Sequence, residues 1–138
     1  MRIEVDGASR LAAEKLAGVA RINGMADLVR RRFITPILGQ EMLYIEKEAE
    51  ARRYVALDPE PVDLSDFPFV AAEVGVTAPT AQQVAQLYLN LGAQWRAVGS
   101  QLENVRLSGV TAVEAATSLA AIQAAVDGVA QAIEGFGA

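Results

Sequence analysis

The side chains that most often carry out catalysis or bind metals are missing from this sequence. Its 138 residues contain no histidine and no cysteine, which removes the commonest general base, the commonest metal ligand and the thiolate nucleophile. Carboxylates remain, but Glu46, Glu48 and Glu50 follow one another at two-residue intervals and so point in different directions on a helix. The acids between Asp58 and Asp66 alternate with prolines and lack the glycine turn of a calcium loop. We therefore expect no enzymatic activity, no cofactor and no metal site.

Charge is distributed unevenly along the chain, whose formal net charge is −5. Residues 1–57 carry ten Lys and Arg and eight Asp and Glu, whereas residues 58–138 carry two and nine. The acidic C-terminal part is a poor surface for nucleic-acid phosphates. No apolar stretch is long enough to span a bilayer, and the charged N-terminal residues do not read as a signal peptide. We expect a soluble protein that binds neither nucleic acid nor a membrane.

Apolar residues recur at intervals of three and four along most of the chain, which is typical of helices that each bury one seam. The longest run, from Thr80 to about Thr117, predicts a helix of roughly 55 Å at about 1.5 Å per residue. Shorter helices are predicted over residues 8–32, 40–57, 69–74 and 119–134. The residues expected to supply capping oxygens are Asp6 or Ser9, Thr80, and Thr117 or Ser118. The predicted fold class is all-α, an elongated helical bundle or hairpin built on one long helix.

The same spacing predicts which residues are buried. In the first helix they are Ala12, Leu16, Val19, Ile22, Ala26, Val29 and Phe33. Gly18 and Gly24 fit either a close helix crossing or a helix that becomes fully ordered only on assembly. In the second they are Met42, Ile45, Ala49, Arg52 and Ala56, with Tyr44 beside them. In the long helix they are Val84, Tyr88, Leu91, Trp95, Val98, Leu102 and Val105. In the last helix they are Leu119, Ile122, Val126, Val129 and Ile133.

Two irregular segments accompany the helices. Arg2–Val5 alternate polar and apolar side chains before a turn at Asp6-Gly7, and they are predicted to form a short extended arm that adds to the sheet edge of a partner. Residues 58–68 contain three prolines and are predicted to form a crossing segment. The apolar residues expected to hold this segment are Val62, Leu64, Phe67 and Phe69. We therefore predict an N-terminal arm, residues 1–7, and a single helical domain, residues 8–138.

Several charged and aromatic residues are candidates for a partner interface. Arg30, Arg31 and Arg32 either complement the negative end of a helix dipole or dock an acidic partner. Trp95 is either a core anchor or an interface hot spot. Glu103 and Arg106 are either a solvated pair or a specific contact, for which Tyr44, Lys47 and Glu48 are the hypothesised partners. The candidate interface residues are Arg2, Ile3, Val5, Arg30, Arg31, Arg32, Tyr44, Lys47, Trp95, Glu103 and Arg106.

Residues 35–51, whose sequence is Thr-Pro-Ile-Leu-Gly-Gln-Glu-Met-Leu-Tyr-Ile-Glu-Lys-Glu-Ala-Glu-Ala, resemble a module of tailed-bacteriophage and prophage proteins from the tail and tail-fibre region. In that module a Thr-Pro-Gly-Gln-like turn precedes Tyr, Lys and Glu-Ala on one helix. The later elements are similar to Phe67–Phe69, to Trp95 with Gly99, to Leu102–Arg106, and to the alanine-rich Ala112–Ala125. The resemblance covers residues 20–133, and one departure is that Pro36-Ile-Leu-Gly39 replaces a tighter Pro-Gly pairing.

The resemblance implies a non-enzymatic structural or adaptor component of a phage tail, located in the virion. Such a protein would attach or brace tail-fibre, baseplate or hub proteins by helix packing, and it would also pack against copies of itself. The alternative is a tail-fibre assembly chaperone, which acts in the host cytoplasm and is not retained in the mature particle.

Overall fold

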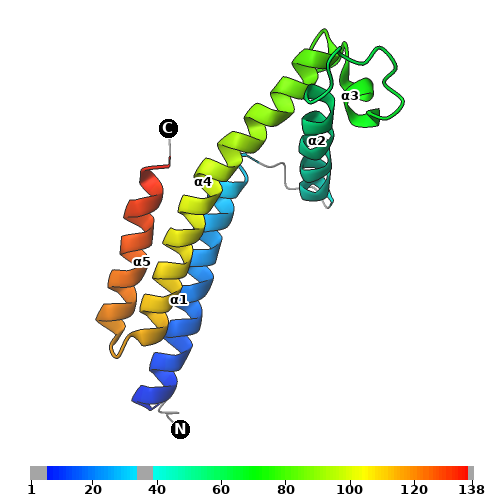
Figure 1. Cartoon of the computed structure of the whole chain (residues 1–138). Coiled ribbons are helices and arrows are strands. Elements are labelled where there is room, and N and C mark those ends of the chain that lie inside the picture. The colour runs from blue at the N-terminus through cyan, green and yellow to red at the C-terminus, as the bar shows by residue number, and fades with distance from the viewer. Residues whose placement is uncertain (1–5, 34–38, 137–138) are drawn as a thin grey trace. The chain divides into compact units, whose positions relative to one another are not determined.

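The computed structural model describes residues 6–33 and 39–136, and these form helices joined by short irregular segments (Figure 1). The predicted all-α fold class is therefore confirmed. The helices are α1 (Gly7–Arg30), α2 (Gln40–Val55), α3 (Pro68–Glu73), α4 (Ala81–Ala115) and α5 (Leu119–Glu134). Residues 2–5 of the predicted arm, and residues 35–38 of the segment that resembles the phage-tail module, lie outside the described residues.

Three helices begin at side-chain caps that the sequence predicts. Asp6 Oδ1 accepts a hydrogen bond of 2.7 Å from the Ser9 amide, and Thr80 Oγ1 accepts one of 3.2 Å from the Gln83 amide. At the start of α5, Ser118 Oγ accepts a hydrogen bond of 3.1 Å from the Ala121 amide. These contacts satisfy amides that have no partner within their own helix, and they fix where α1, α4 and α5 start.

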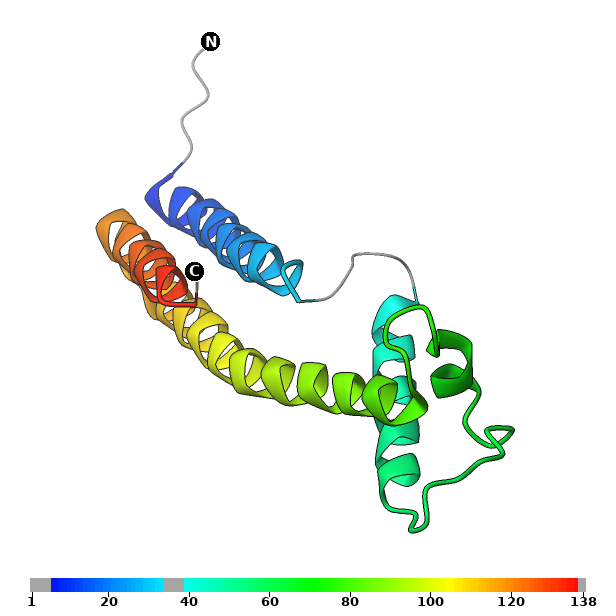
Figure 2. The same ribbon diagram turned by 90° about the horizontal axis from the view of Figure 1, so that it is seen from above.

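The helices are distributed over two compact units, which share α4. One comprises residues 1–33 and 98–138, and we call it the bundle unit because α1, the C-terminal part of α4 and α5 lie side by side in it (Figure 1, Figure 2). The other comprises residues 34–97 and contains α2, α3 and the N-terminal part of α4. We call it the α2–α3 unit.

The core of the bundle unit is apolar and drawn from all three of its helices. Its buried residues are Ile22, Ala26, Val29, Leu102, Val113, Ala116, Ile122, Val126 and Val129. Two glycines allow the helices to approach closely. A Cβ atom added to Gly18 would lie 3.1 Å from Ile122 Cγ2, and one added to Gly109 would overlap the Val129 side chain. Gly24 has nothing within 4 Å of such an atom, so the predicted close crossing is correct for Gly18 and wrong for Gly24.

The predicted seam of α1 is correct in its C-terminal half and displaced in its N-terminal half. Ala12 and Leu16 are exposed, Leu16 to 75%, whereas the bundle core is reached by Leu11 and Gly18. The reason is that α1 packs against Ile122 and Val113 at Gly18, which has no side chain and so is not counted as an apolar position in the spacing. Lys15, on the same side, is half-buried and donates a hydrogen bond of 2.7 Å to the Glu114 carbonyl. On the other helices, Leu91 and Leu119 are also more exposed than predicted, to 47% and 38%.

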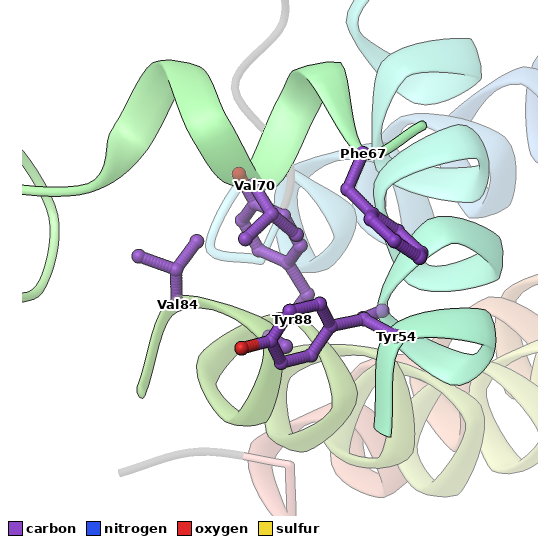
Figure 3. Packing of buried hydrophobic residues seen from close by; sticks show 7 residues of the cluster. Tyr54, Phe67, Val70, Val84 and Tyr88 are labelled. Atoms are coloured by element: carbon purple, nitrogen blue, oxygen red, sulfur yellow. The ribbon is translucent and has the colours of Figure 1, made fainter. Parts of the chain in front are cut away.

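The core of the α2–α3 unit is more aromatic. Figure 3 shows Tyr54, Phe67, Val70, Val84 and Tyr88 converging from α2, α3 and α4 and from the segment before α3. The Tyr54 and Phe67 rings meet edge to face, with 5.4 Å between centroids. Phe67 thereby holds the proline-containing segment onto the unit, as predicted.

Three other apolar side chains were expected to hold the same segment. Leu64 and Phe69 pack against the core. Val62 is 98% exposed, so its predicted role in holding the segment is wrong.

The face of α2 that the sequence predicts to be buried is exposed. Met42 is 71% exposed and Ile45 is 68% exposed, while Glu50, Ala51 and Tyr54 on the opposite face are buried. The prediction fails because the buried face carries a carboxylate and a phenol rather than a row of aliphatic side chains. The partners of these polar groups come from other parts of the chain, so the local pattern of apolar residues favours the wrong face.

Candidate functional site

A buried carboxylate of α2 fixes the start of α3. Glu50 is 1% exposed, and its two oxygens accept hydrogen bonds from the amides of Phe69, at 3.2 Å, and Val70, at 2.7 Å. Phe67, at the N-cap of α3, makes no side-chain cap hydrogen bond. Glu50 therefore supplies from another helix the acceptor that the first amides of α3 need, and its charge suits the positive end of the helix dipole.

A second carboxylate, Glu73, holds the other end of α3. Lys47 Nζ lies 2.8 Å from Glu73 Oε2, and both side chains are less than one-fifth exposed. The Tyr88 hydroxyl donates to the same carboxylate and lies 3.1 Å from the Phe69 carbonyl oxygen. The Lys47 ammonium also lies 5.4 Å from the centroid of the Tyr88 ring and 5.9 Å from that of Tyr44, within the range of a cation–π interaction. The Glu73 carboxylate thus joins α3 to α2 through the ion pair with Lys47, and to α4 through the hydrogen bond from Tyr88.

Burial and hydrogen bonding in this unit shift the pKa values of Glu73, Tyr88 and Tyr54 away from neutral pH. Burial raises the pKa of Glu73, but hydrogen bonds from Lys47 and Tyr88 outweigh burial, and its pKa lies below the ordinary value. Burial, with the neighbouring Glu73 carboxylate, raises the pKa of Tyr88. Burial and a hydrogen bond to Glu60 raise the pKa of Tyr54 to about 12. These shifts favour the charged carboxylate of Glu73 and the neutral phenol of Tyr88, the forms that make the hydrogen bond between them.

Acidification should weaken the α2–α3 unit through Glu73. Because the folded-state pKa of Glu73 is depressed, its contribution is present above the unfolded-state pKa and is lost as pH falls through the folded-state value. We expect the free energy of unfolding, measured by urea denaturation, to fall as the pH drops below the ordinary glutamate pKa of 4.5. Glu73→Gln should be less stable at neutral pH and should lose less stability on acidification.

The matched control for this experiment is Glu41→Gln, which removes an exposed carboxylate from α2. It should leave the acid dependence close to that of the unsubstituted protein. A Glu73→Gln variant with the same acid dependence as the unsubstituted protein would contradict the role assigned to Glu73.

The bundle unit has its own polar network, centred on Glu103 of α4. The predicted pair with Arg106 forms at 2.6 Å, and the Glu103 carboxylate also contacts Arg30 of α1 at 3.1 Å. Arg106 in turn donates a hydrogen bond of 3.1 Å to Asn23 of α1. The hydrogen bond from Arg106 lowers the pKa of Glu103 below its ordinary value. These contacts join α1 to α4 and give Arg30 an interhelical role.

The other candidate interface residues are placed as follows. Arg31 pairs with Asp27 one turn earlier on α1, at 2.9 Å, and Arg32 is exposed. Trp95 is half-buried on α4. The candidates that lie outside the described residues are Arg2, Ile3 and Val5.

Tyr44 and Lys47 lie in the α2–α3 unit, whereas Glu103 and Arg106 lie in the bundle unit. Lys47 is paired with Glu73, and Arg106 with Glu103, so each charge is satisfied within its own unit. The hypothesised contact between the two sets is not needed to balance either charge, and it stays a prediction.

Sequence reasoning missed the two carboxylates that organise this site. The sequence places Glu50 among carboxylates that point in different directions around a helix, and nothing in it singles out Glu73. One signal was available for Glu50: Pro68 opens a short helix directly after Phe67, a residue that cannot cap it. An uncapped buried helix start requires an acceptor from elsewhere in the fold.

A shallow groove of about 280 Å³ runs between α4 and α5 and is lined mainly by small side chains, Gly109 and Gly128 among them. In the part of the chain that the structure describes, no three acidic side chains gather as metal ligands. None of the described helices is both long and apolar enough to cross a membrane.

Comparison with protein families, curated proteins and solved structures finds no match to this chain.

Proposed function

We propose that this protein is a structural or adaptor component of a bacteriophage tail, which attaches or braces tail-fibre or baseplate proteins by helix packing. The observation that carries the proposal is the order of sequence elements that resembles a module of phage tail and tail-fibre proteins. These elements are residues 35–51, Trp95 and Leu102–Arg106. Their partners would be other tail proteins and further copies of the chain.

The contacts of residues within these elements support a role in holding helices together. Lys47 and Glu50 fix the two ends of α3. Glu103 and Arg106 join α4 to α1. These four charged side chains are engaged in the fold of the protein itself, so they hold a surface in shape for a partner, as an adaptor requires.

Mass spectrometry of purified phage particles tests the proposal directly. We expect the protein in the particles, at a fixed copy number relative to the tail-fibre protein. If it is absent from particles but tail fibres fail to assemble when its gene is deleted, the structural proposal fails. The alternative, an assembly chaperone acting in the host cytoplasm, then takes its place. Particles that lack the protein and carry normal fibres would exclude both functions.

A further inference from the structure

The outward face of α2 carries apolar residues at the spacing of a helix–helix interface. Met42 and Ile45 are 71% and 68% exposed, and the three-and-four spacing continues through the partly buried Ala49, then Arg52, to the exposed Ala56. The face formed by these residues lies on the opposite side of α2 from Tyr54, which is buried in the core of the α2–α3 unit. The helix is therefore apolar on a side that its own unit does not cover, and that side has the a/d periodicity of helices that pair.

Charge along this face changes sign from one end of α2 to the other. Glu41 and Glu46 flank its N-terminal half, whereas its C-terminal half carries Arg52 on the face itself and Arg53 beside it. Within the described part of the chain, Arg52 pairs with Glu48 but remains 59% exposed. The described residues provide no ion-pair partner for Glu41, Glu46 or Arg53. The face is thus complementary to a reversed copy of itself.

We propose that α2 packs antiparallel against α2 of a second copy of this chain, about a two-fold axis. In the register that places Ile45 against the partner's Ala56, Glu46 lies beside the partner's Arg53, and symmetry repeats the contact. Arg52 then lies over the partner's Ala49, whose small side chain leaves room for the arginine to reach water. A parallel pair would instead place Glu41 beside the partner's Glu46 and the two Arg52 side chains together, which is repulsive.

The size of the face sets the expected strength of the dimer. Helix α2 has 16 residues and spans about 24 Å, so an α2 pair buries less than the roughly 800 Å² per partner of a standard interface. We expect a reversible dimer with a dissociation constant in the micromolar range. This inference does not depend on the phage-tail proposal, because self-association is measured on the purified chain alone.

The test is sedimentation of the full chain over a range of concentrations. The same measurement is made on variants in which the charge of Glu46, of Arg53 or of both is reversed. The apparent mass should rise from 14.6 kDa toward twice that value. Glu46→Arg and Arg53→Glu should each weaken association about tenfold, because each sets like charges opposite each other. The double variant should recover the original affinity, and a mixture of the two single variants should associate more tightly than either alone. Glu14→Arg, at an exposed position of α1, is the matched control and should change nothing.

Three results would overturn the proposal. The first is a monomer at every concentration. The second is a double variant that associates as weakly as the single ones, since this would place the contact on another surface. The third concerns Ile45→Ser, for which we expect weaker association and an unchanged melting temperature of the monomer. A lower melting temperature without any change in apparent mass would contradict the proposal, because it would mean that the chain itself covers this face.

Discussion

Replacing Glu50 with alanine is expected to destabilise the α2–α3 unit by about 3 kcal/mol. The substitution removes the acceptor of the Phe69 and Val70 amides, and the Val70 side chain is fully buried. A buried donor left without a partner costs about 1–3 kcal/mol, and two donors are affected. Urea denaturation should give the loss in the free energy of unfolding, and hydrogen exchange of the α3 amides should become faster.

Two further variants make the Glu50 prediction specific. Glu50→Gln keeps one acceptor oxygen and should cost less than Glu50→Ala. Glu46→Ala removes an exposed carboxylate from the same helix and should change stability by no more than about 0.5 kcal/mol. The comparison should be made at low protein concentration, where a weak dimer is dissociated. A Glu50→Ala protein as stable as Glu46→Ala would show that Glu50 does not hold α3.

The second large effect is expected at Gly109, where alanine should destabilise the bundle unit by about 2 kcal/mol even though it is the better helix former. An added Cβ atom would overlap the buried Val129 side chain and lie 3.2 Å from Ile22 Cδ1. A valine has little rotamer freedom with which to move away, so α4 and α5 must separate. Thermal denaturation should show a lower melting temperature.

Gly24→Ala is the matched control in the same unit. Gly24 lies in the interior of α1 with nothing within 4 Å of an added Cβ atom. The gain in helix propensity should then appear unopposed and raise stability by up to about 1 kcal/mol. If Gly109→Ala were stabilising by a similar amount, close packing at the crossing of α4 and α5 would be refuted.

The positions of helices could be predicted here because their signals are local. Asp6, Thr80 and Ser118 each cap an amide three residues ahead, so the start of a helix can be inferred from a few neighbouring residues. The prediction for α5, residues 119–134, matches the observed Leu119–Glu134. In that helix the three-and-four spacing also identifies the buried residues Ile122, Val126 and Val129, because its core face is aliphatic.

The buried face of α2 and the polar site could not be predicted in the same way. The amides that Glu50 binds lie 19 and 20 residues further along the chain, beyond a segment without helical periodicity. Glu73 and Tyr88, which meet Lys47 on the same side of α2, are more distant still. A charged residue is buried only where such partners converge, and their convergence is a property of the tertiary fold. Local spacing therefore identified the apolar face of α2 that its own unit leaves exposed.

The division of aromatic residues between the two units has an optical consequence. All three tyrosines and the single tryptophan belong to residues 34–97, and the bundle unit has neither residue type. Intrinsic fluorescence therefore reports the unfolding of the α2–α3 unit alone, whereas the far-ultraviolet dichroism of the peptide bonds reports both units. If the two signals give unfolding curves with the same midpoint, the two units unfold in one cooperative transition. The coupling would then run through α4, which supplies Tyr88 to one core and Val113 to the other. Separate midpoints would give each unit its own stability, measured in a single unlabelled sample.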